Sequence, residues 1–167
     1  VEEILARITA TADRSALSDC DLVIEAVFED EKVKKELFSD LEKICKPDCI
    51  FATNTSSLRV SDLATATNRP DRFVGLHYFY HPAKNRLLEV IPGEKTSEQV
   101  LATAEKFAVL HAKTHITVKD APGFAVNRFF VPWLNEATRI LQEGVANPAT
   151  IDAAAKQTFG IGMGPFE

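Results

Sequence analysis

The side chains best suited to acid–base chemistry are His77 and Glu89, which lie on two successive apolar runs joined by a proline-containing connection. A lone imidazole is a modest base, whereas a nearby carboxylate fixes its tautomer and stabilises the imidazolium ion that it becomes. The spacing allows such a pair. It equally allows His77 simply to end a strand and Glu89 to be a solvated charge at a sheet edge, so the residues alone leave both interpretations open.

A second candidate site is a cluster of small polar side chains that directly follows a short apolar run. Residues 49–53 are typical of a strand, and the segment Asn54-Thr-Ser-Ser comes next. In open α/β sheets, ligands bind beyond the carboxyl ends of the strands. We therefore expect this segment to line a ligand site, although a turn hydroxyl with no such role would have the same composition.

The pattern of elements predicts the sheet that must position these residues. Continuous apolar residues in 21–30 predict a strand that is buried on both faces, as in parallel sheets. Further strands are predicted at 49–53, up to His77, around Glu89 and at 114–118. Helical patterns separate several of these strands. Their alternation over the first 118 residues predicts a doubly wound α/β sheet.

Three helices of this sheet domain have start signals. Asp30 is expected to cap a helix that ends at Pro47, and Ser61 and Ser97 are expected to cap the two later helices. Ser61 would begin a helix at 62–67. The inward faces of the first and third helix are predicted to comprise Val33, Leu37, Leu41 and Ile44, and Val100, Ala104, Phe107 and Ala108, respectively.

The chain changes character at Asp120-Ala-Pro-Gly, after which only helical patterns follow. We expect a sheet domain at 1–120 and the start of a helical domain at 121–167. Pro132 should kink or interrupt the first helix, and Asn147-Pro148 is a good start for the next one. The first helix has an unusually wide apolar surface, which favours burial against another domain or subunit.

Composition excludes several other classes of function. The net charge is −5 with no basic stripe, so no nucleic-acid partner is predicted, and no apolar run is long enough to cross a membrane. The three cysteines lack the spacing of a zinc ribbon or a disulfide framework, which favours a reducing compartment such as the cytoplasm. No metal site is predicted, because His111 and His115 have no third ligand.

Taken together, eight short segments resemble the L-3-hydroxyacyl-CoA dehydrogenases, NAD-dependent oxidoreductases of fatty-acid β-oxidation. Each segment is weak alone, but their ordered set is specific and covers essentially the whole chain. The segments are Asp21-Leu-Val-Ile-Glu-Ala, Asn54-Thr-Ser-Ser-Leu, Gly75-Leu-His-Tyr-Phe, Leu88-Glu-Val-Ile, Lys119-Asp-Ala-Pro-Gly-Phe-Ala-Val-Asn-Arg, Pro132-Trp-Leu-Asn-Glu-Ala, Ile151-Asp and Met163-Gly-Pro-Phe-Glu.

The resemblance implies catalytic roles for four of these residues. His77 matches the general base that takes the proton of the substrate 3-hydroxyl, and Glu89 matches the carboxylate that orients it. Ser56 and Asn127 match positions that hydrogen-bond the substrate near its reacting oxygens. The implied fold is a partial Rossmann-like sheet domain followed by an all-helical domain, with the active site in a cleft between them.

The resemblance also implies an NAD site, in which Glu29, Lys34 and Ser56 match positions on the cofactor side. From composition alone, Glu29 and Lys34 would equally be solvated charges. Tyr80 replaces an asparagine that normally contacts the cofactor, since the family usually has His-Phe-Phe-Asn-Pro where this chain has His77-Tyr-Phe-Tyr-His-Pro. A larger side chain with one hydroxyl changes that contact.

The implied reaction is oxidation of a 3-hydroxyacyl-CoA to the 3-oxoacyl-CoA by a homodimeric enzyme. The family's Gly-x-Gly-x-x-Gly turn, which holds the pyrophosphate, is not among these 167 residues, so this polypeptide by itself should bind NAD weakly and be inactive. Two alternatives stay open: a related hydroxy-acid dehydrogenase that acts without CoA, and a non-catalytic module that dimerises or scaffolds through the segment 124–144.

Overall fold

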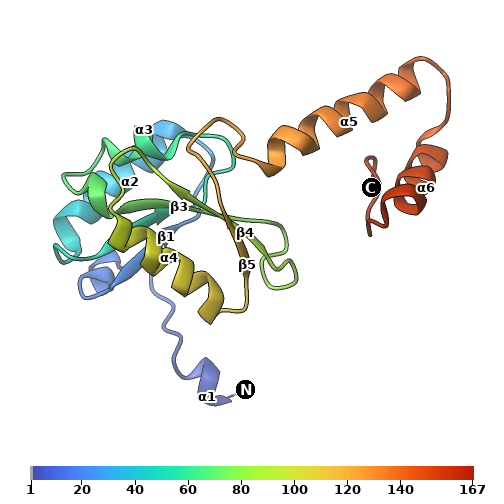
Figure 1. Cartoon of the computed structure of the whole chain (residues 1–167). Helices are drawn as coiled ribbons and strands as arrows, with labels where there is room; N and C mark the ends of the chain where they lie inside the picture. Colours follow the sequence, from blue (N-terminus) through green and yellow to red (C-terminus); the bar gives the residue numbers. More distant parts are fainter. Residues whose placement is uncertain (1) are drawn as a thin grey trace. The chain divides into compact units, whose positions relative to one another are not determined.

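The computed structural model describes residues 2–167, which form two compact units. The first unit ends at Phe124 and contains the whole β-sheet, and the second comprises Ala125–Glu167 and is helical (Figure 1). An α/β sheet followed by helices is the predicted fold class, and it is confirmed. Each unit is described by itself below.

Five strands form one mixed sheet in the order β1-β2-β3-β4-β5. Strands β1, β2 and β3 are parallel, β4 is antiparallel to β3, and β5 is parallel to β4. The parallel strands bring their carboxyl ends to one edge of the sheet, where the loops after β1 and β2 lie. The strands are β1 (Leu22–Glu25), β2 (Ile50–Thr53), β3 (Phe73–Tyr78), β4 (Leu87–Pro92) and β5 (Thr114–Thr117).

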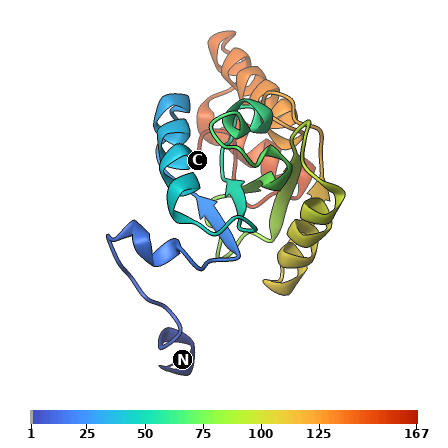
Figure 2. The same cartoon turned by 90° about the vertical axis from the view of Figure 1, so that its left-hand side faces the viewer.

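Helices cover both faces of the sheet (Figure 2). Helices α2 (Glu31–Ile44) and α3 (Val60–Ala64) pack on one face, where the core contains Phe38, Phe51 and Phe73. Helix α4 (Glu98–Leu110) packs on the other face, against side chains such as Val74 and Leu88. Neighbouring residues of β2 and β3, such as Phe51 and Ala52, therefore belong to different cores. The remaining short helices are α1 (Glu2–Leu5), η1 (Arg14–Leu17) and η2 (Pro70–Arg72).

Helix α2 begins as predicted, because the Asp30 carboxylate accepts a hydrogen bond of 2.9 Å from the Val33 backbone N–H. Its buried face matches the prediction only in part, since Leu41 is buried and Leu37 packs against the core as predicted. Val33 is 39% exposed, whereas Lys34, Phe38 and Leu41 are the buried residues of the helix. The apolar spacing was misleading here because a buried cation takes a position on the inner face.

Helix α3 begins two residues earlier than predicted, and Ser61 does not cap it. Asp120 supplies the cap instead. Its two carboxylate oxygens accept hydrogen bonds from the backbone N–H groups of Val60 and Ser61, each at 2.8 Å. A carboxylate at a helix N-terminus satisfies N–H groups that have no partner within the helix. Because Asp120 is distant in sequence, no local signal indicated this contact.

Strand β1 is buried less completely than its apolar run predicted. Val23 and Glu25 are buried, but Ile24 is 36% exposed. Strand β1 forms an edge of the sheet, so fewer side chains surround it than surround the central strands β2 and β3. The continuous apolar pattern identified a strand correctly but did not give its position in the sheet.

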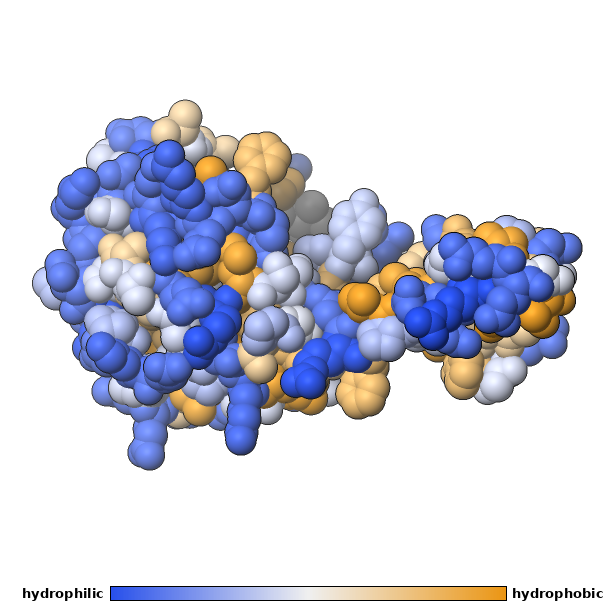
Figure 3. Space-filling view, turned by 90° about the horizontal axis from the view of Figure 1, so that it is seen from above, coloured by the Kyte–Doolittle hydropathy of each residue, from blue (hydrophilic) through white to orange (hydrophobic). Residues whose placement is uncertain are grey.

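The helical unit consists of α5 (Val126–Gln142) and α6 (Pro148–Phe159). Pro132 lies inside α5 and does not interrupt it. The predicted start of α6 is confirmed, since the Asn147 side chain accepts a hydrogen bond of 2.9 Å from the Thr150 N–H. Apolar side chains remain on the surface of this unit (Figure 3), among them Phe129, which is 81% exposed.

Candidate active site

His77 and Glu89 face each other across two neighbouring strands. The antiparallel register of β3 and β4 pairs these residues directly, which puts their side chains on the same face of the sheet. His77 Nδ1 lies 2.7 Å from Glu89 Oε2. Both residues are buried, with 3% and 0% of their surface exposed. The interpretation of Glu89 as a solvated edge charge is therefore wrong.

The buried pair fixes how the imidazole can act. An ionised carboxylate only accepts hydrogen bonds, so an ionised Glu89 would pair with a ring that carries its proton on Nδ1. In the neutral ring this leaves the lone pair on Nε2, which is the nitrogen available to take a proton. The rings of Phe79 and Phe124 lie 4.5 and 5.6 Å from the imidazole, centroid to centroid, and shield it from water.

The polar loop after β2 is joined to the strand that carries His77. Asn54 Oδ1 accepts a hydrogen bond of 2.8 Å from the backbone N–H of Tyr78, the residue that follows His77. The same loop contains Ser56. The sheet thus brings the Ser56 loop and the end of β3 together at the carboxyl end of β2.

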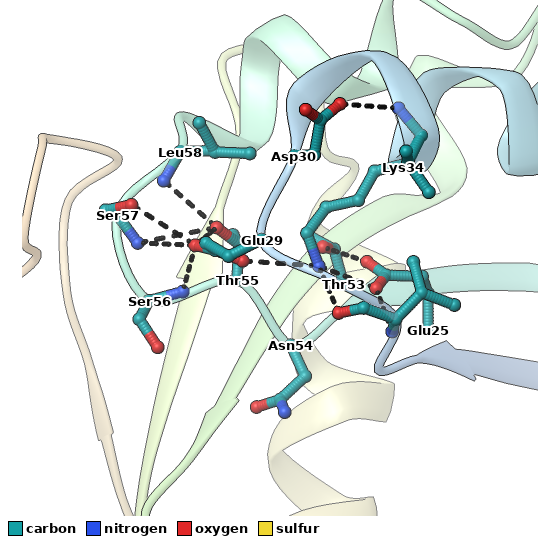
Figure 4. A network of polar contacts seen from close by, with 12 residues as sticks. Glu25, Glu29, Asp30, Lys34, Thr53, Asn54, Thr55, Ser56, Ser57 and Leu58 are labelled. Carbon is teal, nitrogen blue, oxygen red and sulfur yellow. Dashed lines mark hydrogen bonds and ion pairs between the residues drawn. The ribbon is translucent and has the colours of Figure 1, made fainter.

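Glu29 organises this loop from the neighbouring connection after β1 (Figure 4). Its Oε1 atom accepts hydrogen bonds from Thr55 Oγ1 at 2.5 Å and from the N–H groups of Ser56 and Ser57 at 2.8 and 3.1 Å. Partial burial raises the pKa of Glu29, but these donors and the charge of Lys34 outweigh it. The pKa of Glu29 therefore lies below its ordinary value.

Lys34 is completely buried, with 0% of its surface exposed. Its Nζ atom lies 2.6 Å from Glu25 Oε1, 3.3 Å from Glu29 Oε2 and 3.5 Å from the carbonyl oxygen of Val27. A buried cation requires such partners, since desolvation of an isolated charge is very costly. The interpretation of Lys34 as a solvated charge is wrong.

Sequence reasoning missed the carboxylate at the centre of this network. Glu25 is 2% exposed, and besides Lys34 it accepts hydrogen bonds of 2.7 Å from Thr53 Oγ1 and from the Val27 N–H. These contacts join β1, β2 and α2. The available signal was the position of Glu25 at the end of an apolar strand, on the same face as the buried Val23.

Both units of the chain match models of one family. Residues 1–121 match the 3-hydroxyacyl-CoA dehydrogenase NAD binding domain, and residues 123–167 match the 3-hydroxyacyl-CoA dehydrogenase C-terminal domain. The chain belongs to the 3-hydroxyacyl-CoA dehydrogenase family. The resemblance predicted from the eight segments is thereby confirmed.

Similar members of the 3-hydroxyacyl-CoA dehydrogenase family extend well beyond this chain. A 3-hydroxybutyryl-CoA dehydrogenase of Clostridioides difficile is 41% identical over 98% of this chain and 58% of its own length. The crystal structure of (S)-3-hydroxybutyryl-CoA dehydrogenase from Ralstonia eutropha has a TM-score of 0.92 at 38% identity, covering 98% of this chain and 58% of that one. The chain spans little more than half the length of these relatives.

A third similar structure has a different name. A diketoreductase, described as acting on dicarbonyl compounds, has a TM-score of 0.90 at 35% identity and covers 99% of this chain and 59% of its own. Its fold is thus nearly as similar as that of the named CoA enzyme. Overall similarity therefore does not by itself identify the substrate.

The other two site residues predicted from the family are Tyr80 and Asn127. Tyr80 is 85% exposed in the connection between β3 and β4. Asn127 lies in the first turn of α5, in the helical unit. The sheet unit by itself therefore contains His77, Glu89 and the Ser56 loop, while Asn127 comes from the other unit.

The structure describes residues 2–167. Within that range, no group of three or more histidine, cysteine or acidic side chains is arranged to hold a metal ion. Nor does any helix in the range have the length and apolarity needed to cross a membrane. His111 is engaged elsewhere, since its Nε2 atom lies 3.0 Å from the hydroxyl oxygen of Tyr78.

Proposed function

We propose that the protein containing this chain oxidises a 3-hydroxyacyl-CoA to the 3-oxoacyl-CoA with NAD as hydride acceptor. The observation that carries the proposal is the buried His77–Glu89 pair, joined at 2.7 Å and adjacent in the fold to the Ser56 loop. A base oriented by a carboxylate is what removal of a hydroxyl proton requires. Membership of the 3-hydroxyacyl-CoA dehydrogenase family supports the same chemistry.

In this mechanism the Nε2 atom of His77 accepts the proton of the substrate 3-hydroxyl. Glu89 keeps the ring in the required tautomer and stabilises the imidazolium ion that forms. Ser56 and Asn127 hydrogen-bond the substrate near its reacting oxygens and so hold the carbon that loses hydride in position. The buried surroundings of His77 and Glu89 exclude water and strengthen these interactions.

NAD, when bound, supplies the hydride acceptor. The carboxyl ends of β1 and β2 fit the expected place for a dinucleotide in a sheet of this kind. The residues proposed on the cofactor side are Glu29, Ser56 and Tyr80, and both Ser56 and the outer part of Glu29 are accessible there. Lys34, also predicted on this side, is completely buried.

The test is NADH oxidation with acetoacetyl-CoA, using the full open reading frame that contains these residues. Wild type should turn over, and His77→Gln should lose roughly 10²- to 10⁴-fold in kcat, the range expected for loss of a general base. His115→Gln on β5 is the matched control and should keep its rate. Absence of turnover in wild type with NADH bound would refute the assignment and favour a scaffold role.

A related dehydrogenase that acts on a hydroxy acid without CoA is the second candidate. It is favoured by the similarity to the diketoreductase and by Tyr80, which replaces the usual asparagine beside the proposed site. The two candidates differ in a direct comparison of acetoacetyl-CoA with free acetoacetate. A CoA-independent enzyme would use both with similar kcat/KM.

We also propose that the protein is a homodimer in a reducing compartment such as the cytoplasm. The exposed apolar side chains of α5 and α6 support self-association, and the free, largely buried Cys45 and Cys49 support the compartment. Sedimentation of wild type beside Phe129→Lys tests the dimer, which the charge should weaken.

The 167-residue polypeptide assayed alone should be inactive, because it contains no Gly-x-Gly-x-x-Gly turn.

A further inference from the structure

We propose that Lys34 is a positioning residue that acts through Glu29 on the loop bearing Ser56, and that it does not itself contact the cofactor. The kinetic part of this inference rests on the proposed function, whereas its structural part does not. The proposal assigns one role to two charges that sequence reasoning placed separately on the cofactor side.

Lys34 has no N–H donor left for a ligand that binds at the protein surface. An ammonium group has three N–H donors and no acceptor. Three partners surround Nζ: Glu25 Oε1 at 2.6 Å, Glu29 Oε2 at 3.3 Å and the Val27 carbonyl oxygen at 3.5 Å. No part of the side chain reaches the surface. A cofactor at the sheet edge could therefore meet Glu29 but not Lys34.

The two carboxylate oxygen atoms of Glu29 contact different partners. Oε2 faces Lys34, and Oε1 receives hydrogen bonds from the segment 55–57 (Figure 4). The Ser57 hydroxyl also lies 3.2 Å from Oε1. The carboxylate therefore connects a buried cation to the backbone on both sides of the Ser56 side chain.

The charge of Lys34 also prevents repulsion between two neighbouring carboxylates. Without its charge, the carboxylates of Glu25 and Glu29 would face each other with no cation between them, and like charges repel strongly in a buried setting. Glu29 is the more exposed of the two, at 39% of its side chain, so it would turn toward water. The Ser56 N–H would then lose its bond to Glu29, and the Ser57 N–H would keep only the longer contact of 3.4 Å with Thr55 Oγ1.

The structural test is amide hydrogen exchange of the chain carrying Lys34→Met, with Lys35→Met as the matched control. Lys35 is the next residue on α2 and pairs only with Glu31, at 2.6 Å on the surface. Exchange at Ser56 and Ser57 should accelerate about tenfold or more in Lys34→Met and stay unchanged in Lys35→Met. Unchanged exchange in Lys34→Met would overturn the proposal.

Glu29→Ala keeps the test decisive if Lys34→Met does not fold. This variant leaves the Lys34–Glu25 pair intact and removes the acceptor directly. It should accelerate exchange at the same two amides. If it does not, Glu29 does not hold the loop and the proposal fails.

The kinetic test uses the full open reading frame. Lys34→Met should lower kcat with acetoacetyl-CoA about tenfold or more, and it should raise the KM for NADH no more than Glu29→Ala does, because Lys34 acts only through Glu29. The loss should shrink in a Ser56→Ala background, because the two residues act on one contact. A KM for NADH raised well beyond that of Glu29→Ala, with unchanged kcat, would overturn the proposal in favour of a cofactor contact. If wild type shows no turnover, the proposed function fails, and the exchange data alone decide the role of Lys34.

Discussion

The two units of the chain differ in which side chains they bury. The sheet unit buries several charged side chains, whereas the helical unit leaves large apolar side chains exposed. The sheet unit buries Glu25, Lys34, His77 and Glu89, all with 3% or less of their surface exposed. The helical unit buries few large apolar side chains and leaves Phe129 81% exposed and Phe159 64% exposed. Trp133, Phe159 and Met163 line an apolar groove of about 550 Å³ on this unit.

The difference indicates where each unit obtains its stability. Burying charges is costly unless each one is paired and hydrogen-bonded, and in the sheet unit each of these groups is. The sheet unit can therefore hold reactive groups in fixed geometry by itself. The helical unit has apolar surface left over, which is typical of a partner-binding element. We infer that the chemistry depends on packing within the sheet unit, and that assembly depends on the surface of the helical unit.

The largest effect that would test this contrast is the loss of one buried charge. Glu25→Leu leaves Lys34 without its 2.6 Å partner, so we expect the free energy of unfolding to fall by about 3–5 kcal/mol. The measurement is urea unfolding followed by circular dichroism. Glu31→Gln removes the surface partner of Lys35 and should cost less than about 0.5 kcal/mol. Equal costs for the two variants would contradict the contrast.

A smaller effect is expected from a close contact confined to the helical unit. A Cβ atom added at Gly164 would lie 2.5 Å from the Cβ atom of Asp152, whose carboxylate accepts a hydrogen bond from the Phe166 N–H. Gly164→Ala should therefore destabilise this unit by about 1–3 kcal/mol. Gly162→Ala is the control, because nothing lies within 4 Å of its added Cβ.

The chain contains a probe that reports on the helical unit alone. Trp133 is its only tryptophan and lies on α5. Its fluorescence should reveal the unfolding caused by Gly164→Ala, while amide exchange in β1 to β4 should stay unchanged. If exchange in these strands accelerates as well, the two units do not unfold independently.

The smallest effect concerns pH. Because the pKa of Glu29 in the folded chain lies below its ordinary value, its carboxylate stabilises the fold fully above that ordinary value, and the contribution is lost as pH falls through the lowered pKa. Glu29→Gln should therefore be less stable than wild type near neutral pH, by less than about 1 kcal/mol for a partly exposed group. The gap should close in acid. Urea midpoints measured from about pH 7 to about pH 3 would show it, and a gap that widens in acid would exclude this linkage.

Much of the fold followed from local patterns. The strands, the caps at Asp30, Ser97 and Asn147, and the alternation of elements were predictable, because each depends on residues that lie close together in sequence. Two features were not. Asp120 caps α3 from far along the chain, and the exposure of Ile24 depends on the place of β1 at the sheet edge.

The candidate site divides in the same way. The residue types at 77, 89, 56 and 29 and the family motifs predicted a candidate site, and the antiparallel register brings His77 and Glu89 together. The role of Lys34 was not predictable, because it depends on a buried carboxylate from β1 and on the loop after β2. A lysine in a helix has the same sequence pattern whether it is solvated or buried.

The sequence by itself determined the element types, the family and the residues able to do chemistry, because these depend on local spacing and on side-chain identity. Tertiary structure alone decided which charges are buried and what they hold. Burial depends on neighbours that the fold brings together from distant positions. For Lys34, those neighbours turned an ordinary helical cation into the centre of a network that fixes the Ser56 loop.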